Sequence, residues 1–347
     1  MNLTITKEQI IHGLQAVQNV VSTRTTLPIL SNVLLEAEGN RLKLTATDLD
    51  VTISCAVEAQ VKKPGATTVP VKKIFGIVRE LNSGEIEIEV DEKNNCSIRA
   101  GASFYKVNGL AAEEYPPLPK FKDEKKVSLK QETVRSMMKK TSFAISTDES
   151  RYVLNGIFMS LKDHKLTMVA TDGRRLALVD EEVDVTEQSQ GEFIVPAKAV
   201  NELNRLLQGT GEIEIKYSDN QAAFCLKDDK EFSILIISKL IEGNYPNYRQ
   251  VIPQKHAVRI PITVGPFYSA IRQAAIMTDQ ESKRVVFSFS KKKLTLQAKG
   301  AESGRSKVEM PIEYDGKGLD ISFDPKFLAD MLKVLEPDTS LSFDLND

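Results

Sequence analysis

The chain has 347 residues, of which 41% are hydrophobic and 27% are charged, and its formal net charge at pH 7 is −2. This length predicts two or three domains, each able to bury its own core. The charge excludes a generally basic nucleic-acid binder but not a local basic surface. No apolar stretch reaches the roughly 18 residues that a membrane helix needs, and Lys7 and Glu8 stand where a signal peptide would be apolar. We therefore expect a cytoplasmic protein with no membrane partner.

The three cysteines, Cys55, Cys96 and Cys225, are scattered and form no CxxC pair. This spacing gives little support to a disulfide framework or a cysteine zinc site, and it fits a reducing compartment. Each cysteine lies in a strand-like run, so we expect all three to be buried packing residues.

The N-terminal segment predicts an amphipathic helix, a polar loop and two alternating strands joined by a tight turn. The helix is predicted from Ile10, Leu14 and Val17, which recur at helical intervals. The strands are predicted from period-two alternation, and the turns from short polar stretches. The same order of elements occurs three times, in residues 5–50, 129–178 and 262–310.

A second kind of half-unit follows each of these segments. It places a proline near the start of a helix and a strand after the helix, and its copies begin near Val69, Val195 and Ile321. In the first two copies a glycine stands at the helix exit. The first two copies run 51 and 59 residues to proline-rich exits, Val69–Pro119 and Val195–Pro253. The third copy has 27 residues, Ile321–Asp347. Because this comparison leaves strands unpaired, it predicts a C-terminally truncated sequence with an incomplete last domain.

Helices and antiparallel strands in separate layers make the predicted fold α+β. Three repeats of two half-units predict three domains, and six similar units in tandem suggest an arc or a ring. We place the domains at residues 1–122, 123–254 and 255–347.

The chain offers few candidates for catalysis. His12, His164 and His256 lie in different repeats without metal-ligand spacing, and the phosphate-binding and nucleophile motifs are absent. Two aspartates, Asp48 and Asp172, each end an Ala-Thr-Asp tripeptide. They could serve acid–base chemistry or bind Mg²⁺, but their equivalent positions in two repeats favour a structural corner that caps backbone N–H groups. We expect no catalytic residue, no metal and no cofactor, and hence no enzyme.

Basic residues recur on the predicted helices. They could form an ordinary solvated face, but repetition on six similar helices would gather them on one surface. Such a surface would hold a polyanion through its phosphates without reading bases. The basic helix residues are Lys72, Lys73, Arg79, Arg135, Lys139, Lys198 and Arg205.

Several motifs resemble those of one known family along the whole chain. The motifs are "TLPILSNVLL" at 26–35, "TATDLD" at 45–50, "PGATTVPVKKIFGIVREL" at 64–81, "RYVLNGIF" at 151–158, "VATDGRRLAL" at 169–178 and "YPNYRQVIP" at 245–253. With these motifs the sequence resembles the bacterial sliding DNA clamp, the beta subunit of DNA polymerase III.

The resemblance implies the architecture and partners of that family. Its members are head-to-tail homodimers that form a ring of six domains, with helices lining a channel around duplex DNA. They are not enzymes. They are handled by a clamp loader, and they tether the DNA polymerase III catalytic subunit and other clamp-binding-motif proteins of replication and repair. These partners dock a short peptide into an apolar cleft between the second and third domains.

The resemblance also implies site residues. The peptide cleft would be formed by Leu154, Thr171, Gly173, Arg174, Arg175, Leu176, Pro246, Gln250 and Val251. Gln250 stands where many members have arginine, and Arg174 stands where some have histidine. The family's C-terminal tail, one wall of the cleft, is missing from this sequence, so we expect reduced peptide affinity.

For DNA, the resemblance points to Arg24, Arg151 and Tyr152, and more weakly to the helix residues named above. For the dimer interface it points to Tyr105 and Val107 of one copy against Ile276 and Met277 of the other. The alternative hypothesis is a peptide-docking hub that does not form a closed ring, because its third domain is incomplete.

Overall fold

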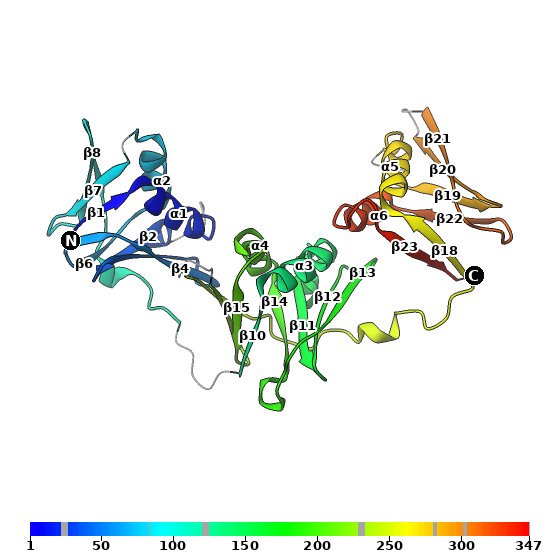
Figure 1. Ribbon diagram of the computed structural model, residues 1–347, viewed down its shortest axis with the longest axis horizontal. Helices are drawn as coiled ribbons and strands as arrows, with labels where there is room; N and C mark the ends of the chain where they lie inside the picture. The colour runs from blue at the N-terminus through cyan, green and yellow to red at the C-terminus, as the bar shows by residue number, and fades with distance from the viewer. Residues whose placement is uncertain are drawn as a thin grey trace. The chain divides into compact units, whose positions relative to one another are not determined.

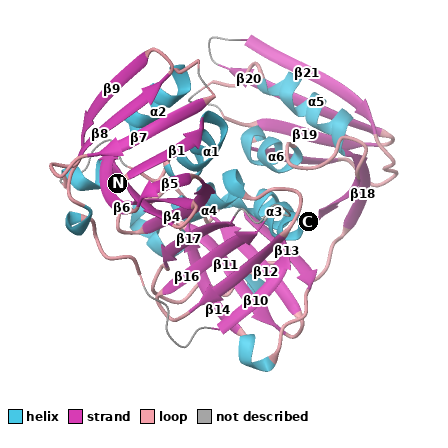
Figure 2. Ribbon diagram, turned by 60° about the vertical axis from the view of Figure 1, so that its left-hand side comes forward, coloured by secondary structure: helices cyan, strands magenta, loops and turns pink. Residues whose placement is uncertain are grey.

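The computed structural model of the protein describes residues 1–21, 27–82, 84–119, 125–227, 233–279, 283–300 and 304–346. Tertiary contacts divide the chain into two compact units, whose helices and strands are drawn in Figures 1 and 2. The first unit comprises Met1–Ala170 and Leu178–Tyr245, and the second comprises Thr171–Ala177 and Pro246–Asp347. Helices pack on antiparallel sheets in both, which confirms the predicted α+β class.

Three antiparallel sheets form the first unit, and the eight-stranded one contains strands of both its repeats. One five-stranded sheet runs in the order β5 (Gln60–Lys63), β1 (Asn2–Thr6), β7 (Glu85–Val90), β8 (Asn95–Ala100), β9 (Ser103–Asn108). An eight-stranded sheet runs in the order β10 (Lys125–Lys130), β15 (Glu212–Tyr217), β16 (Gln221–Lys227), β17 (Ser233–Lys239), β4 (Val51–Glu58), β3 (Arg41–Thr47), β2 (Asn32–Glu38), β6 (Gly65–Pro70). A four-stranded sheet runs in the order β13 (Leu176–Glu182), β12 (Lys165–Thr171), β11 (Gly156–Lys162), β14 (Gly191–Pro196).

The four α-helices of the first unit lie where the sequence predicts helices. They are α1 (Lys7–Val17), α2 (Val71–Glu80), α3 (Gln131–Thr141) and α4 (Ala197–Leu206). At the start of α1, the Gln9 N–H donates to Thr6 Oγ1 and the Thr6 N–H donates to Gln9 Oε1. Both donor–acceptor distances are 3.2 Å, and the two bonds form a capping box. Pro70 and Pro196 directly precede α2 and α4, as predicted. Short 3₁₀ helices are η1 (Pro28–Ser31), η2 (Ala112–Glu114), η3 (Ser142–Ala144), η4 (Glu149–Leu154), η5 (Glu187–Ser189) and η6 (Tyr248–Gln250).

The predicted tight turns are two-residue hairpin loops. They join β2 to β3, β11 to β12 and β19 (Val285–Ser290) to β20 (Lys293–Gly300). Left-handed backbone occurs at Gly39 (φ 57°), at both Asp163 (φ 51°) and His164 (φ 57°), and at Lys292 (φ 58°). Positive φ matches the loop to the right-handed twist of the flanking strands. His164 therefore has a structural position at the tip of a hairpin.

One strand pairing joins the two repeats of the first unit. Strand β4, which follows the first Ala-Thr-Asp, pairs antiparallel with β17, the last strand of the second repeat. Ile53 lies opposite Ile236, and both side chains are fully buried. We call this pairing, with the polar contacts described below, the β4–β17 joint. Their counterparts in the other repeats, β9 and β21 (Gly304–Pro311), are edge strands of their sheets in the described residues.

The second unit has an aromatic core. Its four-stranded sheet has the order β21, β20, β19, β22 (Leu319–Phe323), and a two-stranded sheet pairs β18 (Val258–Thr263) with β23 (Ser340–Leu345). The helices α5 (Val264–Ala275) and α6 (Pro325–Leu332) complete the unit. Phe267 makes edge-to-face contacts with Phe287 and Phe343, at ring-centroid distances of 6.2 and 5.7 Å. The core of the second unit therefore holds a cluster of phenylalanine rings among aliphatic side chains.

Truncating Ile236 tests how much the β4–β17 joint contributes to stability. We expect Ile236→Ala to lower the free energy of unfolding by about 2–4 kcal/mol, because it leaves a cavity between two buried strands. Leu235→Ala is the matched control, because Leu235 is 36% exposed on the opposite face of the same strand. Urea unfolding followed by circular dichroism measures both changes. A loss for Leu235→Ala equal to that for Ile236→Ala would contradict this account.

Candidate functional site

The two Ala-Thr-Asp tripeptides form the same hydrogen-bonded turn. Asp48 Oδ1 accepts from the N–H groups of Asp50 and Val51 at 3.1 and 2.8 Å. Asp172 Oδ1 accepts from the N–H groups of Arg174 and Arg175 at 2.9 and 3.0 Å. We call these two structures the aspartate turns.

The backbone of the two aspartate turns also matches. Leu49 has φ 78° and Gly173 has φ 84°, each directly after the aspartate. A leucine in left-handed backbone is uncommon, so the turn imposes its conformation on the residue present. The corner interpretation of the tripeptide is therefore confirmed, because each carboxylate is engaged in local backbone hydrogen bonds.

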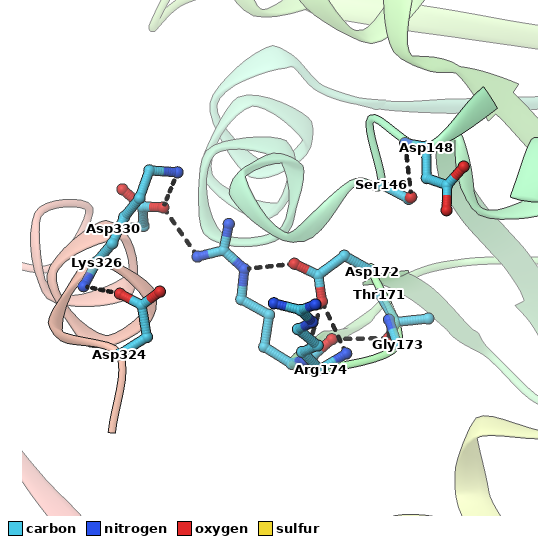
Figure 3. Close-up of polar contacts among 10 residues, drawn as sticks. Ser146, Asp148, Thr171, Asp172, Gly173, Arg174, Asp324, Lys326 and Asp330 are labelled. Carbon is cyan, nitrogen blue, oxygen red and sulfur yellow. Dashed lines mark hydrogen bonds and ion pairs between the residues drawn. The ribbon is translucent and has the colours of Figure 1, made fainter. Parts of the chain in front are cut away.

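In the second aspartate turn, Arg175 contacts helix α6 of the same unit. Its guanidinium lies 3.2 Å from Asp172 Oδ2 and 2.9 Å from Asp330 Oδ2, and its Cζ lies 4.7 Å from the centroid of the Phe327 ring. Figure 3 shows the turn residues Asp172 to Arg174 beside Asp330 and Lys326. The Arg175 side chain is 15% exposed. A guanidinium with two carboxylates and an aromatic face is held in one orientation.

This environment sets the ionisation of Asp172. Partial burial of the carboxyl raises its pKa. Hydrogen bonds from the backbone N–H groups of Arg174 and Arg175, together with the charge of Arg175, lower the pKa by a larger amount. The pKa of Asp172 is therefore below its usual range, and the group is a carboxylate at neutral pH. An ionised, hydrogen-bonded carboxylate has no proton to give, which argues against a general-acid role.

In the first aspartate turn, the carboxylates face cations from the second repeat. Lys198 of α4 forms an ion pair with Asp48, and Lys239 Nζ lies 2.9 Å from Asp50 Oδ1. Nearby, the Arg205 guanidinium donates to the carbonyl oxygens of Gln15 and Ala16, at 2.8 and 2.7 Å. These contacts lie at the C-terminal end of α1, where carbonyl groups lack helical partners. Together with the paired strands they complete the β4–β17 joint.

The predicted DNA residues differ in their exposure and in their contacts within the protein. On α2 and α3, Lys72, Lys73, Arg135 and Lys139 are exposed, and so is Arg79, whose Nε lies 3.0 Å from Glu80 Oε1. In η4, Arg151 lies 3.6 Å from Asp148 and Tyr152 is 58% exposed. Lys198 and Arg205 belong to the β4–β17 joint, and Arg24 lies outside the described residues.

The predicted cleft residues lie mostly in the second unit. Gly173, Arg174, Pro246, Gln250 and Val251 are exposed there, and Val251 is 69% exposed. The other members in that unit are half-buried: Thr171, Arg175 and Leu176. Leu154 lies in the first unit and is buried.

The predicted dimer residues lie on an edge strand and a helix end. Tyr105 and Val107 belong to β9, and Tyr105 is 38% exposed. Ile276 and Met277 directly follow α5, and Ile276 is 72% exposed, the largest exposed fraction among the large hydrophobic side chains described. An apolar side chain exposed to this degree at a helix end is typical of a contact surface.

Several contact residues were not predicted. Asp50, Lys239, Phe327 and Asp330 carry the contacts of the two aspartate turns, and Phe104 on β9 is 58% exposed under the Arg99 guanidinium. The spacing of Lys326 and Asp330, four positions apart, was a signal for a helix-surface ion pair. No local signal relates Asp330 to Arg175, which is 155 positions away.

Reactive groups are scarce in the described residues. Burial raises the pKa of the Cys55 and Cys96 thiols to about 12, and it also raises the pKa of Cys225. No group of three or more His, Cys, Asp or Glu side chains there could hold a metal ion. Among the residues that the structure describes, no helix is both long enough and apolar enough to cross a membrane.

Comparison with known proteins assigns a family to each part of the chain. The DNA polymerase III beta subunit family matches with its N-terminal domain at residues 1–119, its central domain at 128–247 and its C-terminal domain at 249–347. The chain is 34% identical over 337 residues to the beta sliding clamp of Chlamydia trachomatis, covering 96% of this chain and 79% of that protein. It is 30% identical over 348 residues to the beta sliding clamp of Bacillus subtilis, covering 97% and 91%.

Solved structures agree with this assignment. A sliding clamp from Pseudomonas aeruginosa bound to griselimycin superposes with a TM-score of 0.93 at 32% identity, covering 100% of this chain and 93% of that one. The Bacillus subtilis clamp superposes with a TM-score of 0.92 at 28% identity, covering 99% and 92%. These coverages do not support the predicted truncation. The chain belongs to the DNA polymerase III beta subunit family, the beta sliding clamps, which are non-enzymatic processivity factors of replication.

Proposed function

We propose that two copies of this chain form a head-to-tail ring around duplex DNA and tether the DNA polymerase III catalytic subunit, together with other clamp-binding proteins, in the cytoplasm. The observation that carries the proposal is the β4–β17 joint. It unites two repeats by pairing the strand after one corner with the last strand of the next repeat. The equivalent strands β21 and β9 are both edge strands in the described residues, so a second copy can repeat the same pairing.

Apolar side chains beside these edges favour such a pairing. Tyr105 and Val107 lie on β9, whereas Ile276 and Met277 follow α5, which packs against β20 and β21. We call these four residues the dimer seam. Its burial between copies would remove from water the most exposed large apolar side chain described, Ile276.

The DNA surface in this proposal is built from exposed cations on α2 and α3. Lys72, Lys73, Arg135 and Lys139 are exposed on these helices, although the chain as a whole carries a net charge of −2. Flexible cations on a helix surface bind phosphates without reading sequence. Arg24, Arg151 and Tyr152 remain predicted members of this surface.

The peptide surface lies on exposed residues of the second unit. Val251 and Pro246 offer apolar contacts, and Arg174 offers an unburied guanidinium on the second aspartate turn. Such a combination suits a short peptide with apolar anchors and a polar backbone. Gln250 has no charge to contribute here, and Leu154 remains a predicted member.

Encirclement predicts that retention depends on the topology of DNA. The protein is loaded by a clamp loader onto a nicked circular plasmid, the complex is isolated by gel filtration, and the plasmid is then cut once. We expect the protein to remain on the circle and to leave after the cut, because a ring can slide off a free end. Capping both ends with bulky protein blocks should restore retention. Equal retention on circular and uncapped linear DNA would overturn the ring.

Val251 is expected to contribute to peptide docking. We expect Val251→Asp to weaken binding of a fluorescent peptide with two adjacent bulky apolar side chains by about tenfold or more, or roughly 1.4 kcal/mol. Leu49→Asp is the control, because Leu49 is 45% exposed on the first aspartate turn. Fluorescence anisotropy measures both. Equal affinities for Val251→Asp and the unmodified protein would exclude Val251 from the peptide site.

The two arginines of the second aspartate turn are expected to differ. Arg174→Ala should weaken peptide binding several-fold and change the free energy of unfolding by less than about 0.5 kcal/mol, as for other exposed positions. Arg175→Ala should lower that free energy by about 1–3 kcal/mol, because it leaves Asp172 and Asp330 without their shared cation. Denaturation and anisotropy on the same samples separate the two effects. The reverse pattern would contradict these assignments.

A further inference from the structure

The β4–β17 joint includes a polar contact whose partners recur elsewhere in the chain. Arg205 donates from two guanidinium nitrogens to the carbonyl oxygens of Gln15 and Ala16, at 2.8 and 2.7 Å. These oxygens end α1, where the helix dipole gives a negative partial charge. A planar guanidinium with two donors fits two successive carbonyl groups. The contact therefore fixes the end of one repeat's first helix to the second helix of the next repeat.

The donor has an equivalent in the first repeat. Arg205 lies nine positions after Pro196, which precedes α4, and Arg79 lies nine positions after Pro70, which precedes α2. Both arginines lie in the last turn of their helix. By internal repetition, Arg79 occupies the place of Arg205.

The acceptors have equivalents in the third repeat. Gln15 lies nine positions after Thr6, the N-cap of α1, and Arg272 lies nine positions after Thr263, the N-cap of α5. The carbonyl oxygens of Arg272 and Gln273 therefore correspond to those of Gln15 and Ala16. The Arg272 guanidinium does not occupy this position, because it lies 5.6 Å from the centroid of the Tyr268 ring, one turn earlier.

The C-terminal end of α1 is covered by Arg205, whereas the C-terminal end of α5 is exposed. Ala16, beneath Arg205, is 3% exposed, whereas its equivalent Gln273 is exposed. The Arg79 side chain is 64% exposed and pairs only with its neighbour Glu80 among the contacts described, and Glu80 is itself 70% exposed. An ion pair this exposed contributes little and exchanges easily for another partner. The Arg79 side chain and the end of α5 are thus both exposed on the chain. The Gln273 carbonyl oxygen accepts from the Ile276 N–H at 3.4 Å and keeps a second lone pair for another donor.

We propose that Arg79 of one copy donates to the backbone carbonyl oxygens of Arg272 and Gln273 of a second copy and so closes the dimer seam as Arg205 closes the β4–β17 joint. This inference rests on the proposed ring. It gives Arg79 a role between copies rather than on DNA. One difference separates the two contacts: Glu202 orients Arg205 at 3.0 Å, whereas Gly76 stands in the equivalent place in α2 and Glu80 supplies the carboxylate.

Dimer dissociation tests the inference. Sedimentation velocity over a dilution series, without DNA, is expected to show a dimer dissociation constant at least about tenfold higher for Arg79→Ala than for the unmodified chain. Arg79→Lys should lie between them, because it keeps the charge and loses the planar fork. Lys165→Ala removes an exposed cation from a hairpin of the second repeat and should match the unmodified chain. Circular dichroism confirms that each variant is folded.

Proximity is tested separately by cross-linking. One batch carries Arg79→Cys, another carries Gln273→Cys, and the mixed batches are treated with a short bismaleimide. A covalent dimer should form in the mixture and not in either batch alone, which also controls for Cys225. Because the substitutions are on different copies, the product reports contact between copies.

The outcomes separate this inference from the proposed ring. A chain that stays monomeric at all concentrations overturns both. A normal dimer with an unchanged dissociation constant for Arg79→Ala, and no cross-link, overturns only the Arg79 contact. If that variant dimerises normally but binds DNA more weakly with a reduced salt dependence, Arg79 is a phosphate contact and the inference is wrong.

Discussion

The pairing of β4 with β17 is the constraint on which the first unit depends. Backbone hydrogen bonds between strands far apart in sequence turn two repeats into one eight-stranded sheet. Unpaired strand edges expose polar groups that invite association, so pairing removes a liability as well as adding stability. Ile53 and Ile236 fix the register by burying their side chains opposite one another. The same unit holds the ionic contacts of the joint, Lys198 with Asp48 and Lys239 with Asp50.

The aspartate turns show how one local structure serves two different contacts. Each turn is held by its own carboxylate and is insensitive to the next residue, since Leu49 and Gly173 adopt the same left-handed backbone. The first turn presents Asp48 and Asp50 to lysines, whereas the second presents Arg175 to Asp330. The two turns share one backbone conformation, but the first presents negative side chains to its partners and the second presents a positive one. The tripeptide is therefore a scaffold, and the residues around it determine what it contacts.

Sequence periodicity predicted most of the elements and few of their partners. The helices around Ile10 and after Pro70 and Pro196 follow from spacing and local backbone chemistry. The roles of Lys198 and Arg205 do not follow from local sequence, because their acceptors lie 150 and about 190 positions away along the chain. A basic residue on a helix has the same local pattern whether it faces phosphate, a carboxylate or a helix end. Periodicity identifies the outward face but not what covers it.

This difference between cations bears on how a clamp can hold DNA and still slide. Arg205 donates to two carbonyl oxygens and to Glu202, so its guanidinium is held in contacts within the protein. Lys72 and Lys73 are exposed on α2, on flexible side chains in water. Ion pairs in high dielectric are weak and exchange rapidly, so a phosphate bound by such a lysine is released easily. In the proposed ring, structural contacts made by fixed arginines and DNA contacts made by exposed lysines would combine a stable ring with free movement along the duplex.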